Sequence, residues 1–129
     1  MKLNRKADRE PIRFETHLAG STFPNPDGTS RQALLEELHD LVPPTAPDET
    51  PLKVELEREP DNQYDENAIK VLHGGRQLGY LPAPRAQALA FEMDREEPLV
   101  KIRAEITSIS PKNKNGNRSA TLSIIVEDV

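Results

Sequence analysis

Residues 58–71, which read REPDNQYDENAIKV, hold the densest set of chemically capable side chains in the chain. Four carboxylates, two asparagines and one tyrosine stand between two apolar runs that alternate like strands. Carboxylate and amide oxygens can cap a turn, ligate a cation or accept a hydrogen bond from a ligand. These residue types therefore predict either a self-capped corner or a binding surface.

A self-capped corner explains most of the polar residues in this stretch. Pro60 cannot donate a ladder hydrogen bond, so it ends the strand before it. Asp61 and Asn62 can close an Asx turn on the amides that follow, and Asp65 can do the same for the next turn. Asn67 tolerates a left-handed backbone just before the second apolar run. On this interpretation the corner satisfies its own polar groups.

Tyr64 is the residue that a self-capped corner does not explain. A tyrosine at the tip of a polar corner either packs back against the domain or offers its ring to a ligand. Packing is the commoner outcome for a tyrosine in general. The sequence leaves both alternatives open at this point.

A calcium-binding loop fails on its register. Counting from Asp61, the sixth position is Glu66, where an EF-hand loop needs glycine. The twelfth position is Leu72, where the loop needs a bidentate glutamate. We therefore predict no metal site in this stretch.

The sequence shows no catalytic constellation. His17, His39 and His73 share no motif, and the glycine-lysine signature of a phosphate-binding loop is missing. We predict a protein that is not an enzyme and needs no cofactor. A small hydrolase that uses clustered acids with a metal is the least favoured alternative.

Composition indicates one hydrophilic domain. The chain has 129 residues, of which 30% are charged and 35% hydrophobic, and it contains no cysteine. No apolar run approaches the ~20 residues of a membrane-spanning helix, and the N-terminus lacks the apolar core of a secretory signal. The default expectation is a cytoplasmic protein without a membrane partner.

The net charge of −5 is unevenly distributed along the chain. Residues 36–61 carry nine acids and two bases, whereas residues 101–118 carry five bases and one acid. Both runs are compatible with solvated surface, and a basic face also remains possible.

Hydrophobic periodicity predicts six strands and two helices. The strands are expected at residues 12–18, 52–57, 68–72, 77–81, 100–108 and 120–126. One helix is expected from an N-cap at Thr29, with Gln32 completing a capping box, to a stop before Pro43. Pro84 opens the second helix, whose apolar stripe reaches Met93.

Short turns between most strands favour antiparallel pairing. We predict a mainly β, α+β domain: a small six-stranded OB-like or SH3-like β-barrel, partly closed, with two helices. Residues 1–10 are expected to be a flexible leader. Residues 11–129 would form the domain, with a proline-rich loop at residues 43–51.

The chain resembles the HIRAN domain family. The resemblance rests on L-x-R-E-P-x-N-x-Y-D-x-N-A-I-x-V at residues 56–71, a glycine turn, and Q-L-G-Y-L-P at residues 77–82 before an alanine-rich helix. It covers roughly residues 12–109 and departs in the proline-rich stretch. It implies a six-stranded oligonucleotide-binding-like barrel, and the chain looks like the stand-alone bacterial type.

The resemblance also implies a function. HIRAN domains of eukaryotic fork-remodelling translocases bind single-stranded DNA and prefer a free 3′-hydroxyl end. Tyr64 and Phe23 match positions that stack on bases, and Asp65 matches the acceptor of the terminal hydroxyl. Tyr80 matches a pocket residue. The implied function is therefore a DNA end-binding module related to DNA repair or replication.

Two family positions differ in this chain. Thr22 stands where some members carry a basic residue before the first-loop aromatic. The lysine expected after G-Y-L is absent, and Arg85 is the nearest substitute. Lys112, Lys114 and Arg118 are candidate phosphate contacts if their loop faces the same side.

Two classes of partner follow from these observations. The first is a single-stranded DNA end, with a separately encoded helicase, nuclease or other DNA-processing protein recruited to it. The alternative is a protein-interaction adaptor that keeps the fold and has lost DNA binding, which the acidic stretch and the missing bases favour.

Overall fold

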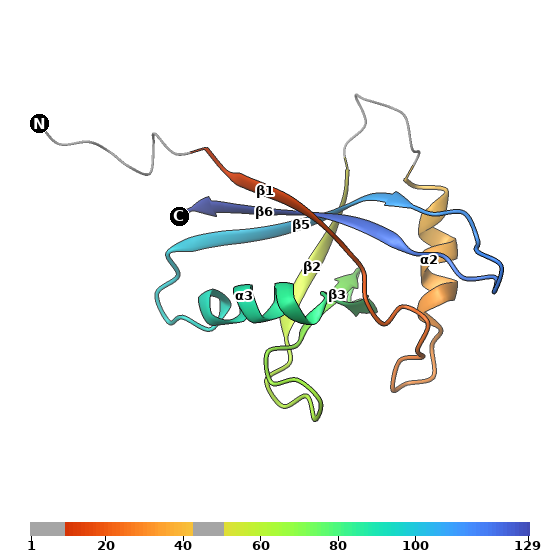
Figure 1. Ribbon diagram of the computed structural model, residues 1–129, viewed down its shortest axis with the longest axis horizontal. Coiled ribbons are helices and arrows are strands. Elements are labelled where there is room, and N and C mark those ends of the chain that lie inside the picture. Colours follow the sequence, from red (N-terminus) through yellow and green to blue (C-terminus); the bar gives the residue numbers. More distant parts are fainter. Residues whose placement is uncertain (1–9, 43–50) are drawn as a thin grey trace, which may run out of the picture.

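Six strands and two helices make up the part of the chain that the computed structural model describes, residues 10–42 and 51–129 (Figure 1). Almost all of the expected leader, residues 1–10, and of the proline-rich loop, residues 43–51, lies outside these residues. The elements are β1 Ile12–His17, α2 Arg31–His39, β2 Leu52–Arg58, β3 Ile69–His73, β4 Arg76–Tyr80, α3 Ala83–Met93, β5 Val100–Ile109 and β6 Ala120–Asp128.

One antiparallel sheet contains all six strands, in the order β1-β6-β5-β2-β3-β4. β5 and β6 are neighbouring inner strands that form a long hairpin, and α2 lies beside the loop that joins them (Figure 1). Eight large side chains in the core are almost fully buried: Leu35, Ile69, Val71, Leu78, Ile106, Leu122, Ile124 and Ile125. Burying each contributes about 1.5–3 kcal/mol. The predicted α+β class is confirmed.

The expected barrel does not close. β1 and β4 are the two edges of the sheet, and no continuous ladder joins them. They meet at one isolated bridge, in which Ala19 and Tyr80 exchange two backbone hydrogen bonds of 2.8 Å. Gly79 permits this approach, because a Cβ atom there would clash with the carbonyl oxygen of Ala19.

The N-terminus of α2 differs from the prediction by one residue. Ser30 is the N-cap, and its hydroxyl accepts a hydrogen bond of 3.1 Å from the amide of Ala33. The Thr29 hydroxyl instead donates to Asp27 in the preceding loop, at 2.6 Å. Gln32 does not complete a capping box, because its side chain bonds the backbone of the loop after β5 and of the loop after β1. Tertiary contacts therefore override the local capping pattern.

α3 follows its sequence pattern closely. Pro84 stands in the first turn, where a missing amide proton costs nothing. Ala86, Leu89 and Ala90 are buried, as the apolar stripe predicts. Neither helix in the described part of the chain is long and apolar enough to cross a membrane.

Replacing Gly79 by alanine should lower the free energy of unfolding by about 1–3 kcal/mol, because the added methyl group overpacks the contact with Ala19. Gly79 does not have a positive φ, so the steric clash is the dominant effect. Urea denaturation measures the change. Gly28→Ala is the contrasting case, because Gly28 has open space around it and a φ of +88°, so its cost comes from backbone strain and not from overpacking. A Gly79→Ala variant as stable as the wild type would contradict this packing argument.

Candidate functional site

A groove of about 890 Å³ opens where the loop after β1, the start of α2, the corner after β2 and the end of β4 meet. Its lining residues are Ala19, Gly20, Phe23, Arg31, Glu59, Asp61, Asn62, Gln63, Tyr64 and Tyr80. Three of the five aromatic residues in the chain are in this set. We call it the aromatic groove. A smaller cavity of about 360 Å³ lies between α3 and strands β2 and β5, and no aromatic residue lines it.

Two of the three aromatic side chains are strongly exposed. Tyr64 is 89% exposed and Phe23 is 66% exposed. The packing alternative for Tyr64 is therefore wrong, and its ring is open to solvent. An exposed aromatic face beside a groove can stack on a flat ligand such as a nucleic-acid base.

The corner that carries Tyr64 is built largely by Asn62. Its Oδ1 accepts the amides of Tyr64 at 2.8 Å and Asp65 at 2.9 Å, which confirms the predicted Asx turn. Asp65 in turn accepts the amide of Asn67 at 2.9 Å. The left-handed backbone expected at Asn67 is wrong, because every positive φ in the described residues belongs to glycine. Asp61 forms no hydrogen bond with any described residue, and it lines the groove with its charge exposed.

Glu59 ties this corner to the floor of the groove. Glu59 Oε1 accepts hydrogen bonds of 2.7 Å from both the side-chain amide of Asn62 and the hydroxyl of Tyr80. The other oxygen pairs with the Lys70 ammonium at 3.1 Å. Burial alone would raise the pKa of Glu59, but these donors outweigh it and hold the pKa below the ordinary value of 4.5. The hydrogen bond to Glu59 also raises the pKa of Lys70.

Arg31 is a groove-lining residue that the sequence analysis missed. Its side chain is almost wholly buried, with 6% of the residue exposed. The guanidinium donates to Asn25 Oδ1 at 2.6 Å and to the carbonyl oxygen of Gly20 at 2.9 Å. It also lies 5.4 Å from the centroid of the Tyr80 ring. Asn25 and Gly20 reach Arg31 only when the loop after β1 is folded. The sequence of the helix therefore gave no sign that Arg31 is buried.

Three other predicted site residues are near the groove or outside it. Asp65 is half-buried beside Tyr64 but is not a lining residue. Thr22 is exposed in the same loop as Phe23 and also does not line the groove. Arg85 lies over the ring of Phe14, 4.8 Å from its centroid, and is likewise not among the lining residues. The structure therefore unites Tyr64, Phe23 and Tyr80, and leaves the predicted roles of the others as predictions.

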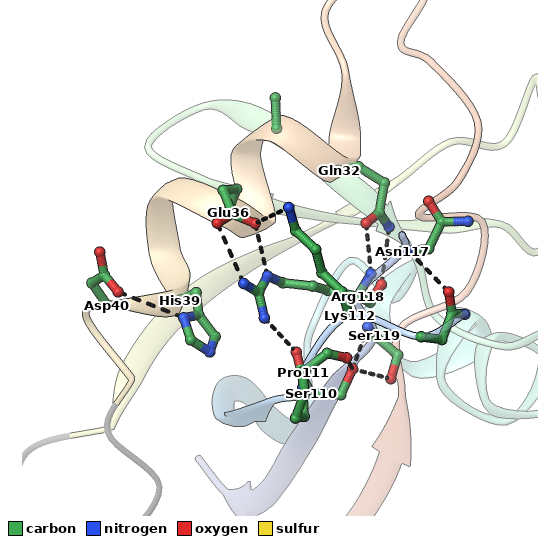
Figure 2. A network of polar contacts seen from close by, with 12 residues as sticks. Gln32, Glu36, His39, Asp40, Ser110, Pro111, Lys112, Asn117, Arg118 and Ser119 are labelled. Carbon is green, nitrogen blue, oxygen red and sulfur yellow. Dashed lines mark hydrogen bonds and ion pairs between the residues drawn. The ribbon is translucent and has the colours of Figure 1, made fainter. Parts of the chain in front are cut away.

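The basic loop between β5 and β6 is held against α2 (Figure 2). Arg118 pairs with Glu36 at 2.8 Å and donates to the Ser110 carbonyl oxygen at 3.0 Å. Lys112 lies 3.8 Å from the same carboxylate. The hydrogen bond from Arg118 lowers the pKa of Glu36 below its usual range, and the pKa of Arg118 is raised in return. Lys114 is exposed and forms no hydrogen bond or ion pair with the described residues.

The described residues contain no group of three or more histidine, aspartate, glutamate or cysteine side chains arranged to hold a metal ion. Within the corner, Asn62 Oδ1 and Asp65 Oδ1 accept backbone amides, and the Glu59 carboxylate accepts side-chain donors. Polar closure of the corner is their observed role.

Comparison with known proteins shows the family of this chain. Residues 49–127 match the family model of the HIRAN domain. The chain belongs to the HIRAN domain family. The matched range contains the Tyr64 corner, Tyr80 and α3, whereas Phe23 and Arg31 lie before it.

Relatives and solved structures extend the comparison. Over 44 residues the chain is 54% identical to the helicase-like transcription factor of Oryctolagus cuniculus and 50% identical to that of Homo sapiens. These segments are 33% of this chain and only 4% of each relative. The chain thus matches a small part of much longer proteins.

Two solved structures share the fold. The crystal structure of the HIRAN domain of human HLTF aligns with a TM-score of 0.58 at 26% identity, over 90% of this chain and 75% of that one. A protein from Lactobacillus plantarum aligns with a TM-score of 0.57 at 22% identity, over 90% and 96% of the two chains. The stand-alone type expected from the sequence stays a prediction.

Replacing Glu59 by glutamine should destabilise the domain most above pH 4.5. The folded-state pKa of Glu59 is lowered, so its ionised form stabilises the fold above the unfolded value of 4.5. This contribution is lost as pH falls through the folded-state pKa. The stability difference between wild type and Glu59→Gln, measured by urea denaturation, should therefore shrink below about pH 4.5.

Glu66→Gln is the control for Glu59, because it removes a carboxylate from the same corner whose side chain contacts none of the described residues. The same pH dependence in both variants would argue against the network around Glu59.

Replacing Arg118 by glutamine should lower the melting temperature, because the loop loses its contacts with Glu36 and Ser110. Lys114→Gln should change it little, since Lys114 is exposed in the same loop and contacts no described residue. Thermal melts followed by circular dichroism compare the two. Equal melting temperatures for both variants would show that Arg118 does not anchor the loop.

Proposed function

We propose that this protein is a non-catalytic module that binds single-stranded DNA and takes a strand end with a free 3′-hydroxyl at the aromatic groove. The observation that carries the proposal is the pair of exposed rings, Tyr64 and Phe23, that line one groove from two different segments. Stacking of a base on such a ring contributes about 1–3 kcal/mol. Two rings at one groove suit one or two nucleotides at the end of a strand.

Asp65 supports recognition of the terminal hydroxyl. Its Oδ1 accepts the Asn67 amide, whereas its Oδ2 forms no hydrogen bond with any described residue. A carboxylate oxygen of this kind can accept a hydrogen bond from a 3′-hydroxyl and repels a phosphate in the same place. The exposed carboxylate of Asp61 adds to that repulsion. A strand that continues past the groove, or that ends in a phosphate, is therefore disfavoured.

Electrostatics favours a short contact over a long one. The chain has a net charge of −5, and phosphate neutralisation by lysine and arginine dominates the affinity of extended DNA complexes. Arg31 is the one cation among the described residues that line the groove. The proposed affinity comes from stacking and from the terminal group, with a weak salt dependence.

The second candidate function is a protein-interaction adaptor. The observation that favours it is a set of exposed apolar side chains that do not line the groove. Phe91 is 68% exposed, Leu99 57% and Val129 55%, and the amide of Val129 donates to the carbonyl oxygen of Leu99. On either function, a separately encoded helicase or nuclease is the kind of partner that we propose.

Fluorescence anisotropy with short labelled oligothymidylates tests the first function. The 3′-hydroxyl form should bind about tenfold more tightly than the 3′-phosphate form, because the phosphate meets the Asp65 carboxylate. Asp65→Asn should remove most of this preference. Equal dissociation constants for the two forms would refute end recognition, and the absence of any binding would favour the adaptor.

Alanine at Tyr64 or Phe23 should weaken oligonucleotide binding by roughly 5- to 150-fold, the equivalent of ~1–3 kcal/mol of lost stacking. Melting temperatures should stay near that of the wild type, since both rings are exposed. Phe91→Ala is the matched control, because Phe91 has a similar exposure but lies outside the groove. A loss of binding as large in Phe91→Ala would show that the effect is not stacking at the groove.

A further inference from the structure

Arg31 is a buried cation without a paired anion. Within residues 10–42 and 51–129 no carboxylate forms an ion pair with it, although only 6% of the residue is exposed. Its hydrogen-bond acceptors are neutral, the side-chain amide of Asn25 and the carbonyl of Gly20. Burial of a charge costs free energy unless an opposite charge is near. The folded domain therefore keeps a positive charge available at this point.

The guanidinium has donors left over. It carries five N–H groups, and Nη2 takes part in no hydrogen bond with the described residues. Since no buried polar atom lacks a partner in the described part of the chain, Nη2 is not sealed from solvent. Arg31 lines the aromatic groove, so the groove is the side from which a ligand approaches the guanidinium.

Other cations close to the site have carboxylate partners. Lys70 pairs with Glu59 at the groove, and Arg118 pairs with Glu36 in the nearby loop. Arg31 differs because the rest of the fold fixes its position while leaving its charge unpaired. Nε is held by Asn25, and the guanidinium lies over the Tyr80 ring. A rigid, preorganised guanidinium is well suited to the planar, two-point recognition of phosphate oxygens.

Gly20 keeps this position open. Its φ is +69°, and a Cβ atom there would lie 3.6 Å from Arg31 Nη1 and 3.7 Å from the Tyr80 ring. The first turn of α2 also contains no acidic residue. The positive end of the helix dipole therefore adds to the charge of Arg31, and no acidic side chain in that turn offsets it.

We propose that Arg31 is the phosphate-binding residue of the aromatic groove, and that it holds the phosphodiester between the last two nucleotides of a bound 3′ strand end. This inference rests on the proposed function. It assigns the backbone contact to a buried arginine in place of the surface cations Arg85, Lys112, Lys114 and Arg118. One internal phosphate is bound, while a phosphate at the terminus itself is repelled by Asp65.

Oligonucleotides with a single neutral methylphosphonate linkage test the assignment. A labelled hexathymidylate with this linkage between its last two nucleotides should bind wild-type protein about tenfold more weakly than the unmodified strand, because a charge-assisted hydrogen bond is lost. The same modification at the 5′-terminal linkage should have little effect. Equal effects at the two positions, or none at either, would overturn the assignment.

Variants connect the effect to Arg31. Arg31→Gln should bind the unmodified strand about as weakly as wild type binds the modified strand, and should no longer distinguish the two. Arg31→Lys should keep part of the discrimination, since it keeps the charge. Lys101→Gln removes an exposed positive charge from β5, outside the groove, and should behave as wild type. An Arg31→Gln variant that keeps the wild-type ratio of dissociation constants for the modified and unmodified strands would refute the proposal.

Circular dichroism melts show whether each variant is folded. If Arg31→Gln is unfolded, the ligand series with the wild type and with Arg31→Lys decides the question. Binding that depends on the 3′-hydroxyl but ignores the terminal linkage overturns this inference alone. Failure of the wild type to bind any oligonucleotide overturns the proposed function and this inference together.

Discussion

The bridge between Ala19 and Tyr80 is the contact on which the site depends. Two backbone hydrogen bonds of 2.8 Å join the segment after β1 to the end of β4, at the two edges of an open sheet. Gly79 makes room for them, because any side chain there would collide with the incoming backbone. Without this contact, nothing in the sheet order would bring the Phe23 loop to the strand that carries Tyr80.

The Tyr80 side chain then makes contacts on both sides of the groove. Its hydroxyl donates to Glu59, which also accepts from Asn62 and so fixes the corner that presents Tyr64. On the other side, the ring lies under the guanidinium of Arg31. The groove is therefore a single connected structure, in which one partly buried tyrosine links an exposed ring to a buried charge.

Arg31, in the first turn of α2, and Arg118, in the loop beside this helix, differ in the groups that they contact. Arg118 pairs with Glu36 and fastens a hairpin loop to the helix, so its charge is largely neutralised by a structural partner (Figure 2). Arg31, the first residue of α2, donates hydrogen bonds only to neutral acceptors and lines the groove. The two arginines are the same residue type in the sequence, and they differ in whether a carboxylate pairs with the guanidinium. The chain shares its fold with the HIRAN domain of human HLTF at 26% identity and a TM-score of 0.58.

Features that depend on neighbouring residues could be predicted from the sequence. Alternation of apolar residues located all six strands, the glycine pair Gly74–Gly75 took the positive φ values of a tight hairpin turn, and Asn62 capped its own corner. Tertiary structure alone decided the exposure of Tyr64, the N-cap at Ser30, the pairing of Arg118 and the burial of Arg31. It also decided that the sheet stays open except at one bridge. The difference lies in the sequence separation of the interacting residues. A turn or a strand pattern is set by residues a few positions apart, whereas burial and ion pairing depend on residues that are distant in sequence, such as Glu36 and Arg118.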